Sequence, residues 1–178
     1  MKMKTLCIAL SLLAVPAVSA ASSPLDQLKK AAGDAGKAAG ETGKGAIEKR
    51  VNEKLMAEAR KNQCSFKSGT DVLAPGCDAK LKKLTSALVD AKKQLDAGGV
   101  KNYKFEVSGH TDSSGDAAKN KELSARRAEV IAKELVSRGV PRSDIISVGR
   151  GSEQPLEKPD NTPAKKAKNR RYEIQVRL

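Results

Sequence analysis

The chain has 178 residues, of which 34 are Lys or Arg and 21 are Asp or Glu, so its formal net charge is +13. Such a basic excess favours an anionic partner, whether nucleic acid, anionic lipid or an acidic cell-wall polymer. Trp is absent and only two Phe and two Tyr are present. Rings on which bases could stack are therefore scarce, and we do not expect binding to nucleic acid.

The first twenty residues have the pattern of a secretory signal peptide. Lys2 and Lys4 precede an apolar run from Leu6 to Val15, and small residues end at Ala20, after which we expect cleavage. The run is shorter than the roughly 20 apolar residues that span a bilayer, although an uncleaved anchor is the alternative. No later stretch is apolar enough to span. We therefore expect an exported mature chain with a charge of +11, because two lysines are lost.

Two cysteines, Cys64 and Cys77, follow the signal. In an oxidising compartment an isolated pair most simply forms a disulfide. Closing a loop of this size would stabilise the fold by about 3 kcal/mol in the chain-entropy description. The chain has one histidine, His110, and no CxxC spacing. We therefore expect neither a metal site nor a cofactor.

Residues 21–62 differ from the rest and form a helical or disordered N-terminal arm. Residues 29–45 contain only Ala, Gly, Lys, Asp, Glu and Thr, and cannot build a core. Ile47, Val51 and Leu55 then recur every fourth residue, which predicts a short helix with a narrow apolar stripe. We favour an arm that packs on its own domain or frays. The alternative is a docking or self-association helix whose partner is an outer-membrane protein or anionic lipid.

Residues 63–178 have the size of one compact domain. Hydrophobic periodicity and turn residues predict elements in the following order: a short edge strand at 66–73, a helix at 78–96, a strand at 103–107, a helix at 117–138, a strand at 145–148 and a last strand at 172–178. This order predicts an α+β fold, a two-layer mixed sheet of about four strands with helices on one side.

The helix at 117–138 carries a charge on its apolar face. Its buried stripe is defined by Leu123, Val130, Ile131 and Leu135. Arg127 and Asn120 fall within this stripe, whereas Arg126 lies off it. A buried guanidinium needs an anion. The first candidate is Asp112, in the turn before the helix. The second is Glu134, which also falls in the stripe but can bend out to water.

The polar segment Gly109–Asp116 is expected to be a loop at the end of a strand, a common place for ligand sites. Asp112, Asn120 and Arg127 would then meet at one rim. A carboxylate and a guanidinium suit a zwitterion, since the first binds an ammonium and the second a carboxylate. The alternative is that Asp112 and Arg127 simply pair with each other. His110 is interpreted as a loop-edge imidazole without a catalytic role.

Four motifs within residues 64–178 lead to a family: Gly109-His110-Thr111-Asp112 with Asn120, Leu123-Ser124-Ala125-Arg126-Arg127-Ala128, Gly139-Val140-Pro141 ahead of Gly149-Arg150-Gly151, and Asn169-Arg170-Arg171-Tyr172-Glu173-Ile174. Together they resemble the OmpA-like C-terminal peptidoglycan-binding domain. The resemblance implies a βαβαββ fold and non-covalent binding of peptidoglycan through the diaminopimelate residue of its peptide stem. It also implies the periplasm of a Gram-negative bacterium, with peripheral association with the outer membrane.

The resemblance assigns roles to individual residues. In that family the loop Asp and the Arg of L-S-x-x-R-A hold diaminopimelate, so Asp112 would bind its ammonium and Arg127 its carboxylate. Asn120 would support the same site. Thr111 and Arg171 are further ligand-binding candidates, and Arg171 is chosen over its neighbour on motif position only. A zwitterion could separate a resting Asp112–Arg127 pair by replacing each partner.

Two other functions compete with wall binding. A cell-wall hydrolase could use His110 and Asp112 for acid–base work. The sequence establishes no paired carboxylates, no metal set and no free nucleophilic cysteine if the disulfide forms, so we do not expect an enzyme. The other alternative is an interaction or scaffold protein whose basic arm docks on a membrane protein or anionic lipid.

Overall fold

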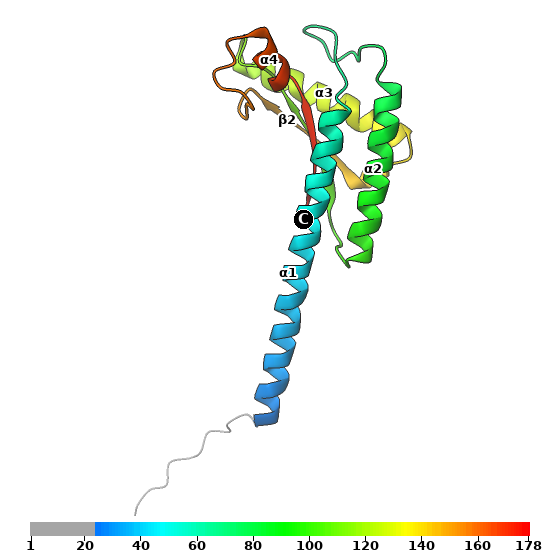
Figure 1. Cartoon of the computed structure of the whole chain (residues 1–178), viewed down its shortest axis with the longest axis vertical. Helices are drawn as coiled ribbons and strands as arrows, with labels where there is room; N and C mark the ends of the chain where they lie inside the picture. The colour runs from blue at the N-terminus through cyan, green and yellow to red at the C-terminus, as the bar shows by residue number, and fades with distance from the viewer. Residues whose placement is uncertain (1–23) are drawn as a thin grey trace, which may run out of the picture. The chain divides into compact units, whose positions relative to one another are not determined.

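The computed structural model describes the backbone from Pro24 and the side chains from Gly43, so the predicted signal peptide, residues 1–20, lies outside the described residues. The chain divides into two units, Met1–Ala39 and Gly40–Leu178, and the second contains the candidate site. The elements in chain order are α1 (Pro24–Lys61), α2 (Asp78–Ala97), β1 (Lys104–His110), α3 (Ala117–Ser137), the 3₁₀ turn η1 (Arg142–Asp144), β2 (Ile145–Gly151), α4 (Pro163–Asn169) and β3 (Tyr172–Arg177) (Figure 1).

The sheet has β1 at its centre, in the order β2-β1-β3. β1 runs parallel to β2, with Phe105 opposite Ile145, and antiparallel to β3, with Phe105 opposite Val176. The helix α3 connects the two parallel strands, as a parallel crossover requires. The predicted α+β fold with a mixed sheet is therefore confirmed.

The predicted fourth strand, at 66–73, is wrong. Phe66 and Leu73 form only an isolated antiparallel bridge. The segment turns back on itself, since the backbone N–H of Lys67 donates to the carbonyl of Val72 (2.9 Å). Its polar backbone groups are thus satisfied locally and do not extend the sheet.

One face of the sheet packs against the helices. The core includes Phe105, Val107 and Ile174 from the strands, together with leucines of α2 and α3. Val51, Leu55 and Ala59 of α1 are each 1% exposed and belong to the same core. The C-terminal part of α1 runs beside α2, and Lys54 of α1 donates to Gln94 of α2 (3.4 Å) (Figure 1).

The apolar stripe of the arm therefore packs on its own domain. The compact unit begins at Gly40, whereas the sequence boundary was expected at residue 63. The reason is that Val51, Leu55 and Ala59 bury their side chains in the shared core. No helix in the part of the chain that the structure describes is long and apolar enough to cross a bilayer.

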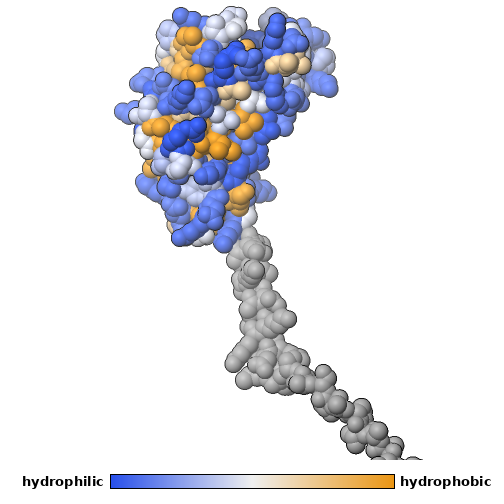
Figure 2. Space-filling view, turned by 180° about the vertical axis from the view of Figure 1, so that it is seen from behind, coloured by the Kyte–Doolittle hydropathy of each residue, from blue (hydrophilic) through white to orange (hydrophobic). Residues whose placement is uncertain are grey.

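The other face of the sheet is covered by charged side chains. Glu106 is 8% exposed and pairs with Arg150 of β2 (2.7 Å) and Arg177 of β3 (3.3 Å). Two cations satisfy the carboxylate and offset the cost of burying it. Figure 2 shows the compact unit from behind, with hydrophobic residues in small patches among hydrophilic ones.

Two glycines let α3 lie directly on the sheet. A Cβ on Gly109 would stand 2.2 Å from the carbonyl oxygen of Ser124, and one on Gly149 would stand 2.5 Å from that of Lys121. Neither position could hold a side chain without moving the helix backbone. The hydroxyl of Ser124 also accepts from the backbone N–H of Gly151 (2.9 Å), which ties α3 to the end of β2. This close contact fixes α3, and therefore Arg127, relative to the loop after β1.

Candidate functional site

The loop from Thr111 to Asp116 is held at both ends. The backbone N–H of Thr111 donates to the carbonyl of Gly151 at the end of β2 (2.9 Å). Asp116 caps α3 by accepting from the backbone N–H of Lys119 (2.9 Å). Asn120 donates through its side-chain amide to the carbonyl of Ser114 (2.8 Å). The loop that carries Asp112 is therefore braced by the helix that carries Arg127.

Asp112 is held by two donors. One oxygen accepts from the backbone N–H of Ser114 (3.0 Å), and the other accepts from Nη1 of Arg170 (2.7 Å). Burial raises the pKa of Asp112, but the hydrogen bonds from Arg170 and Ser114 outweigh it, so the pKa lies below its ordinary value. Asp112 is therefore a carboxylate at neutral pH.

Arg127 is buried on α3, with 9% of its surface exposed. Its Nε donates to the carbonyl of Thr70 (2.8 Å), and its guanidinium carbon lies 5.0 Å from the ring centroid of Phe66. No carboxylate of the described residues lies within 4.0 Å of this guanidinium. Burial and then the charge of Arg170 lower the pKa of Arg127. The cation is thus fixed by one carbonyl and one aromatic face.

Two predictions about α3 meet different outcomes. The burial of Arg127 beside an exposed Arg126 is confirmed, since Arg126 pairs with Glu122 on the surface. The resting pair of Asp112 and Arg127 is wrong. Arg170, at the end of α4, reaches Asp112 and binds it instead.

Glu134 is not the partner of Arg127 either. It pairs with Arg138, one helical turn further along α3. Neighbours four residues apart on a helix meet easily, whereas Glu134 and Arg127 are seven apart.

A cavity of about 860 Å³ lies over these residues. Its charged and polar lining includes Arg60, Gln63, His110, Asp112, Ser114, Asn120, Arg127, Lys168, Arg170 and Arg171. Phe66, Leu123 and Leu156 add apolar walls. The structure therefore brings Asp112, Asn120 and Arg127 together in one cavity, at the end of the sheet where β1 delivers its loop.

Thr111 and Arg171 are placed differently from Asp112 and Arg127. Thr111 is buried at the base of the loop and is absent from the cavity wall. Arg171 lines the cavity, but its Nε donates to Glu173 (2.7 Å) and its Nη2 to the carbonyl of Gln154 (3.1 Å). The neighbouring Arg170, not Arg171, contacts Asp112.

His110 is the last residue of β1 and not a loop-edge imidazole as expected. It is 2% exposed, and neither ring nitrogen has a hydrogen-bond partner among the residues that the structure describes. Burial and then the charge of Arg171 lower its pKa to about 4. The ring is therefore neutral at physiological pH. It is buried because β1 extends to His110, beyond the predicted end at residue 107.

Asp160 is a residue that sequence reasoning missed. One of its oxygens accepts from the backbone N–H of Ser113 (2.9 Å) and from the amide of Asn169 (3.0 Å), and its other oxygen accepts from the hydroxyl of Ser113. These hydrogen bonds lower the pKa of Asp160 to about 2. Asn169 opens the late Asn-Arg-Arg motif, but Asp160 lies in a loop without a periodic signal. It ties the site loop to the segment before α4.

Cys64 and Cys77 are buried free thiols in the structure, so the predicted disulfide is not formed in it. The sulfur of Cys64 lies 3.8 Å from the carbonyl oxygen of Cys77. Burial first, and then Cys77, raise the pKa of Cys64 to about 12. The segment between the two cysteines supplies Phe66 and Thr70 to Arg127. The pairing stays a prediction, which counting thiols in the exported protein would check.

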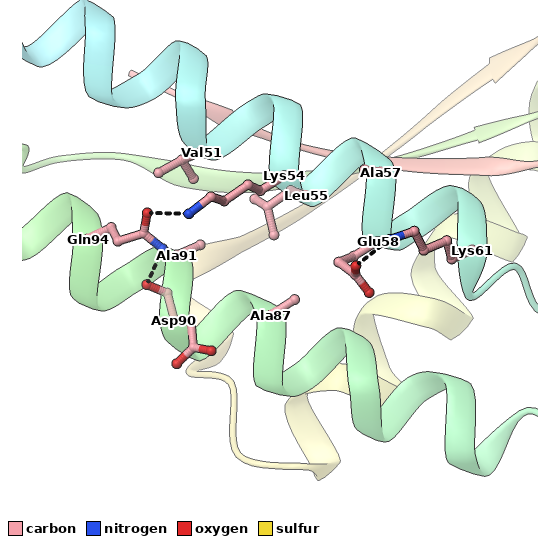
Figure 3. A pocket seen from close by; sticks show the side chains of 10 residues that line it. All are labelled: Val51, Lys54, Leu55, Ala57, Glu58, Lys61, Ala87, Asp90, Ala91 and Gln94. Atoms are coloured by element: carbon pink, nitrogen blue, oxygen red, sulfur yellow. Dashed lines mark hydrogen bonds and ion pairs between the residues drawn. The ribbon is translucent and has the colours of Figure 1, made fainter.

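A second cavity, of about 360 Å³, lies between α1 and α2 (Figure 3). Its floor is apolar, with Val51 and Leu55 facing the alanines of α2. The charges at its rim pair locally, as Lys61 does with Glu58 (3.2 Å). It lacks the separated carboxylate and guanidinium of the first cavity, which is therefore the candidate site.

The geometry defines a class of protein. Within the described residues no cluster of His, Cys, Asp and Glu could hold a metal ion. The larger cavity instead joins one ionised carboxylate to a fixed guanidinium, which suits a small zwitterionic group. The described residues thus form an α+β domain with a cavity of mixed charge at the end of its sheet.

The family model described as the OmpA family matches residues 65–170, and the chain belongs to this family. The family predicted from the four sequence motifs is confirmed. The matched residues include both α3 and the loop that carries Asp112.

Curated relatives align with part of the chain. The probable lipoprotein YiaD of Escherichia coli (strain K12) is 41% identical over 113 residues, which are 64% of this chain and 47% of that protein. The outer-membrane lipoprotein YfiB of Pseudomonas aeruginosa is 35% identical over 112 residues, 62% of this chain and 60% of that one. The peptidoglycan-binding protein ArfA of Mycobacterium tuberculosis is 46% identical over 70 residues, 39% of this chain and 21% of that one. The chain spans less than two thirds of each relative.

Solved structures share the fold. A MotB-like protein from Desulfovibrio vulgaris superimposes with a TM-score of 0.55 at 19% identity, over 77% of this chain and 94% of that chain. The peptidoglycan-associated lipoprotein from Burkholderia pseudomallei superimposes with a TM-score of 0.50 at 23% identity, over 64% and 86%. At these identities the likeness is one of fold.

Proposed function

We propose that this protein binds peptidoglycan non-covalently and catalyses no reaction on it. The diaminopimelate residue of the peptide stem would be held between Asp112 and Arg127. The observation that carries the proposal is the guanidinium of Arg127, which is buried, fixed and without a carboxylate within 4.0 Å among the described residues. A buried cation in this state is best satisfied by an anion from a ligand. Diaminopimelate offers a carboxylate and an ammonium on one carbon.

The ammonium would bind Asp112. This carboxylate is ionised at neutral pH, and its present partner Arg170 approaches from a half-exposed position. Asn120 would act by bracing the loop through Ser114, with no contact to the ligand required. Thr111 and Arg171 would likewise shape the site, the first from the loop base and the second from the cavity wall.

Membership of the OmpA family supports this proposal. A relative is named as a peptidoglycan-binding protein and a structural neighbour as a peptidoglycan-associated lipoprotein. Other relatives are named as outer-membrane proteins or lipoproteins. We accordingly propose that the protein works in the periplasm of a Gram-negative bacterium, associated with the cell wall and peripherally with the outer membrane, as a binding protein rather than an enzyme.

Co-sedimentation with purified sacculi tests the proposal. Asp112→Asn and Arg127→Ala should each lose most of the retention seen for the wild type, because each removes one charge of the site. Arg126→Ala is the matched control, since Arg126 is adjacent but exposed and paired with Glu122. It should sediment like the wild type.

Retention of both site variants at the wild-type level, with their folds intact by circular dichroism, would refute the proposal. Release of soluble muropeptides from the sacculi by the wild type would instead support a hydrolase.

A further inference from the structure

The cavity carries more positive charge than one zwitterion can neutralise. Its lining includes five cations and one carboxylate, Asp112. The cations are Arg60, Arg127, Lys168, Arg170 and Arg171. A ligand with an ammonium and a single carboxylate would leave this excess unchanged.

The pairing of these cations shows where the excess lies. Arg171 is paired with Glu173 (2.7 Å) and Lys168 with Glu157 (2.7 Å), both outside the cavity. Arg170 is paired with Asp112 (2.7 Å). An ammonium that binds Asp112 would compete with Arg170 for this carboxylate. Once displaced, Arg170 would be a cation in the cavity without its partner.

Arg170 differs from Arg127 in freedom of movement. Its side chain is 45% exposed, follows the last residue of the short helix α4, and has one side-chain partner, Asp112. Arg127 is 9% exposed and held by Thr70 and Phe66. The two guanidinium groups are close enough for the charge of Arg170 to lower the pKa of Arg127. Arg127 is therefore a cation held in a fixed position. Arg170 is a neighbouring cation that can exchange its partner Asp112 for another carboxylate.

We propose that Arg170 determines specificity by binding a second carboxylate of the same stem peptide after the ligand ammonium releases it from Asp112. The carboxylate assigned to Arg170 is the α-carboxylate of the glutamyl residue joined to diaminopimelate, the neighbouring residue of the stem. This inference rests on the proposed function. Its consequence is that the protein distinguishes stems with a free glutamyl carboxylate from stems in which this group is an amide.

The test is a calorimetric titration with two synthetic peptides, L-alanyl-γ-D-glutamyl-meso-diaminopimelate and the same peptide amidated at the glutamyl α-carboxyl. The wild type should bind the free acid about tenfold more tightly than the amide, because one charge-assisted hydrogen bond typically contributes about this factor to affinity. Arg170→Gln should bind the two peptides with equal affinity. The ratio is the readout, because loss of Arg170 also removes a competitor for Asp112 and so shifts both affinities.

Two matched variants complete the experiment. Arg126→Gln removes an exposed arginine outside the cavity and should keep the wild-type ratio. Arg60→Gln removes a lining arginine that makes no ion pair with the described residues, and it should also keep the wild-type ratio. Three results for the ratio of the two peptide affinities would overturn the inference while leaving the proposed function intact. The ratio could be unchanged in Arg170→Gln, it could be lost in Arg60→Gln instead, or it could equal one in the wild type. A wild type that binds neither peptide would overturn both.

Discussion

Arg127 is the residue on which the proposed site depends most. Its position on the buried face of α3 would be costly for a guanidinium without partners. The carbonyl of Thr70 and the ring of Phe66 meet part of this cost but bring no negative charge. Among the described residues only Nε has a hydrogen-bond partner, so Nη1 and Nη2 could bind a carboxylate in the planar geometry that arginine prefers.

His110 gives a prediction for the pH dependence of stability. Its pKa is about 4 in the fold against 6.5 for the free side chain. Below pH 6.5 the unfolded chain gains a proton that the folded chain cannot accept, so stability falls as pH decreases from about 6.5 to about 4. The free energy of unfolding should drop by about 2 kcal/mol between pH 7 and pH 5. The charged groups that face the ring are Arg171, Glu173, Arg150 and Glu106.

Urea unfolding at several pH values measures this effect, with His110→Gln as the variant that should lack it. Because His110 is the only histidine in the chain, its ring resonance in the folded protein provides an independent reading. The resonance should not shift until the pH nears 4. A midpoint near pH 6.5 in the folded state would contradict the prediction.

At the scale of the elements, α3 and the sheet form one rigid support for the site. Gly109→Ala places a methyl group 2.2 Å from the backbone oxygen of Ser124. The helix must then move off the sheet, which we expect to cost about 2 kcal/mol or more of unfolding free energy. Because α3 carries Arg127, wall binding should fall as well. Urea unfolding and sacculus sedimentation measure the two effects.

Gly45→Ala is the matched control for this substitution. Gly45 lies within α1, and a Cβ there would meet no atom within 4 Å. Alanine should therefore stabilise the helix by up to about 1 kcal/mol. Equal effects of the two substitutions would show that contact between α3 and the sheet does not control the site.

The helices, the sheet class and the burial of Arg127 could be predicted from the sequence, because each depends on the period of a single element. Residues 78–96 and 117–138 were expected to be helical, and α2 and α3 cover nearly the same ranges. The contacts of Arg170 and Asp160 could not be predicted. Both depend on how the segment around α4 packs against a loop about fifty residues earlier in the chain. No local sequence pattern predicts this long-range contact.

The predicted fourth strand failed for a related physical reason. The alternation of apolar and polar residues near Phe66 is compatible with either a sheet edge or a small hairpin. The turn at Gly69, which has a positive φ, favours the hairpin. This hairpin is what brings Phe66 and Thr70 to Arg127, so the local departure from the expected sheet also builds the site wall.

At the scale of the whole molecule, α1 belongs to the domain only in part. Deleting residues 21–39 removes a segment outside the compact unit and should leave the unfolding free energy and wall binding unchanged. Deleting residues 21–60 also removes Val51, Leu55 and Ala59 from the core. Losing one large apolar core side chain typically costs about 2–5 kcal/mol, so the longer deletion should unfold a domain of ordinary stability.

The same pair of deletions examines the docking alternative for the arm. If the arm binds anionic lipid or an outer-membrane protein, the 21–39 deletion should lose membrane association and keep wall binding. Loss of wall binding with the fold intact would instead place part of the ligand site in the arm. Vesicle flotation and sacculus sedimentation of the two deletion proteins give these readings.

The most direct measurement compares the affinity of the wild type and Arg127→Ala for two soluble tripeptides, one ending in meso-diaminopimelate and the other in lysine. Lysine keeps the terminal ammonium but lacks the carboxylate that Arg127 is proposed to bind. The wild type should prefer the diaminopimelate peptide at least about tenfold, and Arg127→Ala should show no preference. Equal affinity of the wild type for the two peptides would contradict a site built on Asp112 and Arg127.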